Sequence, residues 1–423
     1  MPTLIPQTCP ALRAAPIEVA SGLRGEDGLV FLDTARADRG SPEARFSILA
    51  ARPLQIIEGN IFNRRDRELL RRIYQANCQP AASTPDLGFP LAGLYGAIEY
   101  EGDFRFGDYR EVLVYDHEGD RWIEQGSLSR LALRMPEREI RDVENSAGLN
   151  FSPQAAAKQY EAAVRTAQDY IAAGDIYQVN LTHRFLADTD QSIDPFAYYE
   201  GLRSCSPTPH AAFLDQGKRQ IASSSPEQFL SISGSTIKTR PIKGTRPRFN
   251  DPEQDEKSAY DLRTSSKENA ELIMITDLQR NDIGQICDFG TVKATELLKL
   301  ERYEQVFHLV STVQGELRED IDPIEAFHAC FPGGSITGAP KKRAREIISE
   351  LESEPRGLYT GAIGCFGYNG ESRFNIAIRT AIFEEGQAHF HVGAGIVADS
   401  DPTAEWEETL HKAAGLLEAA RKG

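Results

Sequence analysis

Lys243 lies in a basic segment, residues 239–248, whose residue types could support nucleophilic chemistry. The alternation of side chains predicts a strand that Gly244 ends. Three arginines are expected close to the amine: Arg240, Arg246 and Arg248. Nearby cations and burial both lower the pKa of a lysine toward the range in which its neutral amine attacks carbon. An exposed basic turn would have the same composition, so both interpretations stay open on this segment alone.

Two pairs of glutamates have a spacing of three residues, which places both carboxylates of a pair on one face of a helix. The pairs are Glu268 and Glu271 in a helix predicted near residues 257–274, and Glu405 and Glu408 in a helix predicted near residues 402–421. Lys412 continues the second face by one turn. Carboxylates from two helices could together bind Mg²⁺, which prefers oxygen ligands. Each pair could equally lie on a solvated helix surface.

A glycine-rich segment, residues 331–343, has features of an anion-binding turn. Gly333 and Gly338 have the spacing of a phosphate-binding loop, but alanine and proline stand where that motif needs lysine and a hydroxyl residue, which excludes nucleotide phosphate binding. Thr337 lies near the predicted start of a helix with Pro340 in its first turn, where free N–H groups attract anions. Close backbone approach is also expected at Gly393 and Gly395. A tight turn would explain each segment equally.

The composition argues against several classes of protein. The formal net charge of −16 argues against nucleic acid and anionic membranes as partners, because both attract basic surfaces. No apolar stretch approaches the length of a membrane span, and residues 1–20 lack the apolar region of a secretory signal, so we expect a cytoplasmic protein. The cysteines show no metal-ligand spacing and are expected to be reduced thiols: Cys9, Cys78, Cys205, Cys287, Cys330 and Cys365.

The pattern of apolar residues and turn signals predicts an α+β protein built on large antiparallel sheets rather than on repeated βαβ units. A polar segment at residues 136–153 divides the chain into an N-terminal region, residues 1–150, and a C-terminal region, residues 151–423.

Local signals place several of the elements that would hold the candidate residues. A helix is predicted over residues 64–76, and Ser152 and Pro153 are expected to begin another. Single strands are predicted over residues 176–185 and 373–383.

Six ordered segments of the C-terminal region resemble the chorismate-utilising enzymes, a family that includes anthranilate synthase component I, aminodeoxychorismate synthase component I, isochorismate synthase and salicylate synthase. The segments are PIKGTR at 241–246, DLQRND at 277–282, FPGGSITGAP at 331–340, RGLYTG at 356–361, IRT at 378–380 and GAGIVADS at 393–400. The resemblance covers about residues 152–420. It implies the fold of anthranilate synthase component I, with large antiparallel sheets packed as a sandwich and helices around them.

Within this family, the residue at position 243 separates two activities. The anthranilate synthases carry alanine in the PIKGTR segment, whereas the aminodeoxychorismate synthases carry lysine, as this chain does. The resemblance therefore implies that Lys243 attacks C2 of chorismate, and that ammonia then adds at C4 and expels the lysine. The product would be 4-amino-4-deoxychorismate, on the route to 4-aminobenzoate and folate. Glu227 matches the general acid for the C4 hydroxyl, a role that requires a raised pKa.

The resemblance also implies ligands for the substrate and for one metal ion. The positions that bind Mg²⁺ are matched by Glu268, Glu271, Glu405 and Glu408. The positions that bind the two carboxylates of chorismate, or lie near its ring, are matched by Thr337, Gly338, Tyr359, Arg379, Gly393, Gly395, Lys412 and His308. His308 could equally be a satisfied core imidazole.

The source of ammonia is expected to be a second protein. No cysteine lies in the G-x-C-x-G setting of an amidotransferase nucleophile, so we expect a separate class I glutamine amidotransferase subunit in a heterodimer. The tryptophan-site segment Leu-Glu-Ser of the anthranilate synthases is Leu32-Asp33-Thr34 here, so tryptophan inhibition is not expected. Two alternatives stay open, an anthranilate synthase component I and a catalytically silent paralogue that binds a ligand or partner. The intact Lys243 and Glu227 argue against the second.

Overall fold

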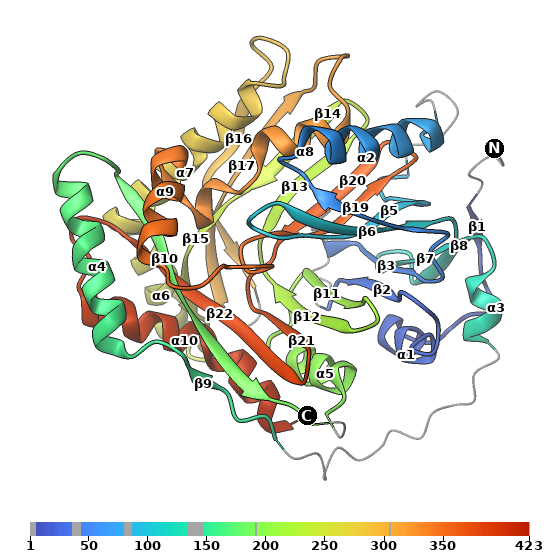
Figure 1. Ribbon diagram of the computed structural model, residues 1–423, viewed down its shortest axis with the longest axis horizontal. Coiled ribbons are helices and arrows are strands. Elements are labelled where there is room, and N and C mark those ends of the chain that lie inside the picture. The colour runs from blue at the N-terminus through green and yellow to red at the C-terminus, as the bar shows by residue number, and fades with distance from the viewer. Residues whose placement is uncertain are drawn as a thin grey trace.

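The structure is a computed structural model that describes residues 6–35, 44–79, 87–133, 148–190, 193–303 and 306–422. Over these residues its framework is two antiparallel sheets, one of twelve strands and one of ten, with helices around them (Figure 1). The expected α+β class and the sandwich of large antiparallel sheets are therefore confirmed.

Each sheet combines strands from both halves of the chain. In hydrogen-bonding order the twelve-stranded sheet contains β1 (Gln7–Thr8), β8 (Arg121–Gln125), β7 (Val112–Asp116), β3 (Phe46–Ala50), β2 (Val30–Asp33), β11 (His210–Asp215), β12 (Arg219–Ser225), β21 (Thr380–Glu384), β22 (Gln387–Ile396), β10 (Gln178–Asp188) and β18 (Gly338–Ala339), with β9 (Ser152–Pro153) also paired to β10. The ten-stranded sheet contains β15 (Ile242–Pro247), β17 (Val306–Glu316), β14 (Thr236–Arg240), β13 (Gln228–Ser233), β20 (Glu371–Ile376), β19 (Ala362–Gly367), β5 (Gly93–Ile98), β6 (Asp103–Tyr109) and β4 (Ile56–Asn60), with β16 (Lys293–Arg302) also paired to β17. The regions 1–150 and 151–423 thus share both sheets, and the boundary between them stays a prediction.

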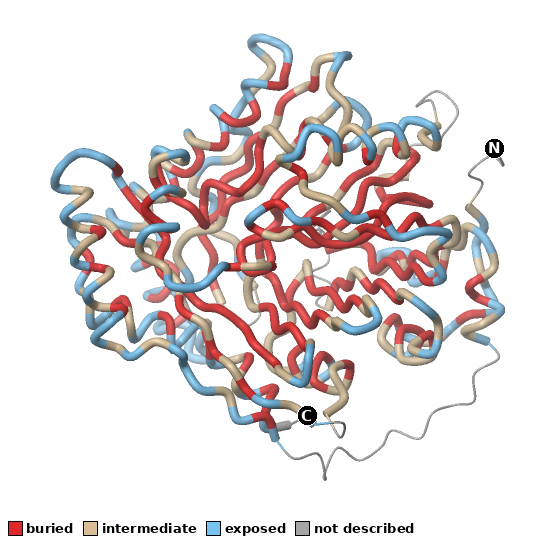
Figure 2. Tube along the Cα trace, viewed as in Figure 1, coloured by how far each residue is buried: buried red, intermediate tan, exposed pale blue. Residues whose placement is uncertain are grey.

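Two hydrophobic cores lie on the two faces of the twelve-stranded sheet. Successive side chains of a strand point to opposite faces, and in β2 Val30 belongs to one core and Phe31 to the other. The larger core includes residues of both sheets, such as Phe106 of β6 and Phe366 of β19, whose ring centroids are 5.5 Å apart. Figure 2 shows the buried residues concentrated along the strands. The strands are therefore a rigid base for residues in their connections.

Helices pack around the two sheets. They are α1 (Pro16–Gly22), α2 (Arg64–Asn77), α3 (Leu128–Ala132), α4 (Ala157–Ala172), α5 (Pro195–Cys205), α6 (Pro252–Thr264), α7 (Ser266–Gly284), α8 (Pro323–Cys330), the short 3₁₀ helix η3 (Gly334–Ile336), α9 (Lys341–Leu351) and α10 (Pro402–Lys422). Helices α5 and α10 pack on strands of the twelve-stranded sheet, and α7 packs on β16 and β17 of the other. Within the described ranges, no helix combines the length and the apolar composition that a bilayer span requires.

Two helix predictions were wrong at their boundaries. Ser152 and Pro153 form β9 rather than the start of a helix, and α4 begins later, at Ala157. The single helix expected over residues 257–274 is divided into α6 and α7 at Ser265, whose side-chain oxygen accepts a backbone N–H of the following helix. This division matters because it places the first turn of α7 beside the candidate site. The helix predicted over residues 64–76 and the strand predicted over residues 176–185 are confirmed as α2 and β10.

Candidate active site

Two connections that cross between the sheets lie together, and each carries a predicted site residue. Glu227 lies between β12 and β13, and Arg379 lies between β20 and β21. The single strand predicted over residues 373–383 is therefore wrong, because the chain turns at Arg379, whose φ is 50°. The N–H of Ile376 donates to Glu227 O at 3.0 Å, and Ser225 Oγ donates to Ile376 O at 2.6 Å. These bonds hold the two connections side by side.

The side chain of Glu227 is enclosed by protein. The residue is 5% exposed, and Ser335 Oγ donates to its Oε1 at 2.8 Å. Burial raises the pKa of Glu227 to about 7, although the Ser335 hydroxyl, the charge of Lys243 and the N–H of Ile242 act in the opposite direction. A carboxyl group with this pKa can hold a proton near neutrality and donate it to a leaving oxygen.

Lys243 is paired with a carboxylate instead of being surrounded by cations. Its Nζ lies 3.5 Å from Glu271 Oε2 of α7, and its side chain is 17% exposed. Two of the three expected arginines, Arg240 and Arg248, are hydrogen-bonded to other carboxylates, whereas the charge of Arg246, like that of Lys243, lowers the pKa of Glu268. Gly244, with a φ of 71°, marks a bulge within β15 instead of its end. The bulge lets the strand continue while the lysine faces α7.

The four glutamates predicted to bind a metal lie in the first two turns of α7 and α10, with Glu268 and Glu405 in the first turn of each helix. The two helix ends are connected by Lys267, whose Nζ is 3.8 Å from Glu405 Oε1. Burial, and then the adjacent carboxylate, raise the pKa of Glu268 beside Glu271 and of Glu405 beside Glu408. Across the described part of the chain, no three His, Cys, Asp or Glu side chains are already gathered as metal ligands. The all-carboxylate donor set and its mutual repulsion fit a hard divalent cation such as Mg²⁺.

Arg379 offers a positive charge that the protein itself leaves unused. The residue is partly buried, and its guanidinium makes no hydrogen bond or ion pair with the residues that the structure describes. Burial lowers the pKa of Arg379, but a guanidinium stays charged at neutral pH. On the other side of the site, Lys412 Nζ donates to Gly393 O at 2.9 Å and pairs with Glu408 at 2.7 Å. Both residues therefore fit the binding of a substrate carboxylate.

Two glycines, Gly338 and Gly395, let the backbone pass close to side chains and backbone of the candidate site. Gly338 has a φ of 144°, and a Cβ there would lie 2.2 Å from Gln178 O. A Cβ at Gly395 would lie 2.5 Å from Gln178 Nε2 and 3.5 Å from Lys243 Nζ. The strand β22 therefore runs directly beside Lys243, the candidate nucleophile. A side chain larger than glycine at position 395 would displace the lysine amine.

Chorismate binding is supported by the comparison with known proteins. The family model described as chorismate binding enzyme matches residues 90–418 of the chain. The chain belongs to this family of chorismate-binding enzymes. Chorismate is therefore the substrate that the site has to hold.

Similar proteins carry different activities in their names, two among the relatives above 30% identity and a third in a structure that is similar in fold. The chain is 39% identical over 333 residues to the aminodeoxychorismate synthase component 1 of Bacillus subtilis, covering 75% of this chain and 70% of that protein. It is 37% identical over 414 residues to the anthranilate synthase component 1 of Thermus thermophilus, covering 89% of each. The crystal structure of anthranilate synthase component I from Streptococcus pneumoniae TIGR4 has a TM-score of 0.78 and 32% identity, covering 91% of this chain and 95% of that chain. The isochorismate synthase MenF of Escherichia coli, at 17% identity, has a TM-score of 0.78 over 98% of this chain and 94% of its own, and supports the fold alone.

Two residues that the sequence did not single out lie beside the candidate site. Gln178 and Asn180 of β10 lie on the same side of the sheet as Gly393 and Gly395 of β22. The side-chain oxygens of both are buried and have no hydrogen-bond partner among the described residues. Buried carbonyl oxygens are normally paired, so these two can accept hydrogen bonds from a ligand. Alternation along β10 was readable from the sequence, but its pairing with β22 was not.

Tyr359, a predicted substrate ligand, lies beside β22. It is buried and stacks on His391 of β22, with ring centroids 5.5 Å apart. Both ring nitrogens of His391 are buried without a partner among the described residues, and burial lowers its pKa well below the usual value. The ring is therefore neutral, and it supports the phenol by stacking.

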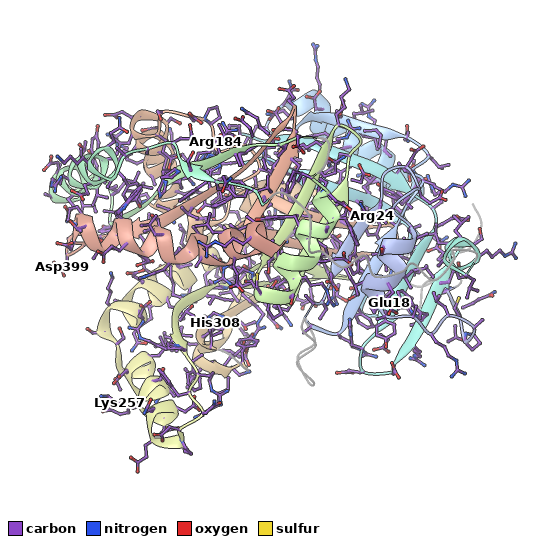
Figure 3. The ribbon with its side chains drawn as sticks, turned by 90° about the horizontal axis from the view of Figure 1, so that it is seen from below. Glu18, Arg24, Arg184, Lys257, His308 and Asp399 are labelled. Atoms are coloured by element: carbon purple, nitrogen blue, oxygen red, sulfur yellow. The ribbon has the colours of Figure 1, made fainter. Side chains whose placement is uncertain are left out.

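The remaining predicted ligands occupy different settings. Thr337 is fully buried and its hydroxyl donates to Gly333 O at 2.9 Å, so it does not cap α9, which begins after Pro340. His308, labelled in Figure 3, lies on β17 with its Nδ1 3.1 Å from Thr245 Oγ1. Their roles toward chorismate stay predictions.

Proposed function

We propose that the chain is component I of an aminodeoxychorismate synthase, which converts chorismate and ammonia to 4-amino-4-deoxychorismate and water. The observation that carries this proposal is the placement of Lys243 beside Gly395 and close enough to Glu227 to influence its pKa. A nucleophilic amine and a carboxyl group that is protonated near neutrality are the two groups that this reaction needs.

In the proposed reaction, the neutral amine of Lys243 forms a bond to C2 while the C4–O bond breaks. Glu227 gives its proton to the departing hydroxyl, which leaves as water. Ammonia then forms a bond to C4, the ring double bonds return, and the bond between C2 and the lysine nitrogen breaks. A proton from the new C4 ammonium group restores Glu227. Atoms and charges balance, and the lysine is regenerated.

The other residues of the site hold the substrate. Arg379 and Lys412 supply positive charge for the carboxylates, and Gln178 and Asn180 supply hydrogen-bond acceptors. The metal would be held by Glu268, Glu271, Glu405 and Glu408. Bound there, Mg²⁺ would supply positive charge for the ring carboxylate. The net charge of −16 makes this local positive charge necessary for a dianionic substrate.

The nearest alternative is an anthranilate synthase component I. Two of the similar proteins described above carry that name. The residue at position 243 favours the aminodeoxychorismate reaction, because the anthranilate synthases carry alanine in this segment. Without a lysine adduct at C2, ammonia can attack C2 itself, which leads to anthranilate.

Ammonia is proposed to come from a separate class I glutamine amidotransferase subunit, with both proteins in the cytoplasm. The sequence supports this, because none of its cysteines lies in a G-x-C-x-G segment. The purified chain should therefore use ammonium but not glutamine, and an added amidotransferase subunit should confer glutamine use.

The reaction is tested by separating the products from chorismate, MgCl₂ and ammonium by chromatography. We expect 4-amino-4-deoxychorismate and loss of turnover in excess chelator. Without ammonium, a covalent adduct on the peptide that contains Lys243 should be detected by mass spectrometry after rapid quenching. Lys243→Ala should lose both the adduct and the product, whereas Lys257→Ala, on the exposed face of α6, should keep both. Anthranilate as the main product, or unchanged turnover by Lys243→Ala, would contradict the proposal.

A further inference from the structure

Three lysines are paired with three of the four glutamates that we assign to the metal. Lys243 Nζ is 3.5 Å from Glu271 Oε2, Lys267 Nζ is 3.8 Å from Glu405 Oε1, and Lys412 Nζ is 2.7 Å from Glu408 Oε1. These lysines come from β15, from the first turn of α7 and from α10. The carboxylates are thus neutralised from three different elements of the fold.

Lys267 has no role in the reaction proposed above, yet it belongs to this charge cluster. It is the second residue of α7 and reaches across to α10. Its positive charge lowers the pKa of Glu268, Glu405 and Glu408, so it acts on carboxylates of both helices. Its side chain is 54% exposed, so it can swing into solvent without leaving a cavity.

An ammonium group and a magnesium ion compete for the same carboxylate oxygens. They also repel each other, so both cannot occupy the site at close range. We propose that Lys243, Lys267 and Lys412 are internal counter-ions that hold the metal carboxylates until a magnesium ion displaces them. This inference rests on the metal assignment made under the proposed function.

The exchange would connect metal loading to the nucleophile. Displacement of Lys243 from Glu271 frees the amine whose attack on C2 the proposed reaction requires. A chain without metal would keep that amine paired and directed at α7. Lys267 is the most exposed of the three lysines and would be displaced at the solvent side of the site.

The exchange is tested by isothermal titration of the full chain with MgCl₂. Lys267→Met removes one competing cation, so we expect its Mg²⁺ dissociation constant to be roughly two- to fivefold smaller than that of the native chain. Lys267→Gln serves as a second replacement. The matched control is Lys257→Met, a lysine on the exposed face of α6 at the outer edge of the molecule in Figure 3. At about 0.15 M salt, charges more than about 8 Å apart are largely screened, so the control should leave the affinity unchanged. Equal or weaker Mg²⁺ binding by both Lys267 variants, or no Mg²⁺ binding by the native chain, would overturn the proposal.

A second measurement follows the release of Lys243 directly. A brief pulse of an amine-acylating reagent, with and without MgCl₂, is read by peptide mass spectrometry, with Lys257 as the internal reference. We expect Mg²⁺ to raise the labelling of Lys243 relative to Lys257 severalfold, and an unchanged ratio would overturn the proposal. Neither measurement uses chorismate, so a wrong product in the chorismate assay would refute the proposed reaction alone. Equal or weaker Mg²⁺ binding by the Lys267 variants, or an unchanged labelling ratio, would refute the exchange alone, whereas no Mg²⁺ binding by the native chain would refute the metal assignment as well.

Discussion

The protonation state of Glu227 depends on contacts between residues far apart in the sequence. Burial raises its pKa, and Ser335 and Lys243 lower it by stabilising the charged carboxylate. Ser335 belongs to η3, which follows more than a hundred residues later. The resemblance to known enzymes predicted the role of this glutamate, but the cause of its proton affinity is visible only when the two connections and η3 come together.

Replacing Ser335 by alanine should move the alkaline limb of the pH profile to higher pH. The Ser335 hydroxyl donates to Glu227 Oε1 and lowers a pKa that burial brings to about 7. The acid must be protonated to act, so kcat/KM for chorismate should fall as pH rises through about 7 in the native chain. Loss of the donor destabilises the charged carboxylate and raises the pKa further, so the fall should begin at higher pH. The measurement is kcat/KM against pH at saturating ammonia.

Two further variants control for this effect. Ser235→Ala changes an exposed serine of a turn and should leave the limb in place. Glu227→Gln should lose most of the activity. The pH profile of its residual activity should no longer show the alkaline limb. A limb that stays fixed or moves to lower pH in Ser335→Ala would rule out Glu227 as the group that titrates.

At the scale of elements, some boundaries could have been read from the sequence and others could not. The division between α6 and α7 could have been read, because Ser265 is followed three residues later by Glu268, which is typical of a helix start. The turn at Arg379 could not have been read from the sequence. Non-glycine residues with positive φ are uncommon, and no glycine or proline marks a turn at this position. The pairing of Lys243 with Glu271 was missed for the same kind of reason, since it depends on where α7 packs.

Replacing Arg356 by methionine should destabilise the elements around the site. Arg356 is 1% exposed, makes two hydrogen bonds to Glu352, the residue that follows α9, at 2.9 and 2.8 Å, and donates to Ile336 O and Asn180 O. Its removal would leave the Glu352 carboxylate without its counter-ion, with only the N–H of Thr182 still donating to it, and would remove a donor from two carbonyls, so the free energy of unfolding should fall by about 3 to 5 kcal/mol. Urea unfolding measures this. The matched control is Arg165→Met, an arginine of α4 that is 60% exposed and should cost less than about 1 kcal/mol. Equal losses in the two variants would contradict the buried network.

At the scale of the whole molecule, the order of strands in the sheets was beyond sequence reasoning. The resemblance predicted the sandwich and supplied the residues of the candidate site, because its segments carry the residues that we propose to react. Local propensity does not state that β2 lies beside β11 or that β5 lies beside β19, since those strands are far apart in the chain. The polar segment at residues 136–153 suggested two regions, and it lies mostly outside the described residues.

The shared sheets predict that the C-terminal region does not fold alone. A fragment of residues 148–423 would lose β5, which pairs with β19 over six residue pairs, and β2, which pairs with β11. It would expose two strand edges and the core face that includes Phe366, which packs against Phe106 of the missing part. We expect this fragment to aggregate, and co-expression with residues 1–133 to restore a soluble complex with cooperative unfolding, measured by size-exclusion chromatography and circular dichroism. A monomeric fragment 148–423 that unfolds cooperatively at the melting temperature of the full chain would show that the region is an independent domain after all.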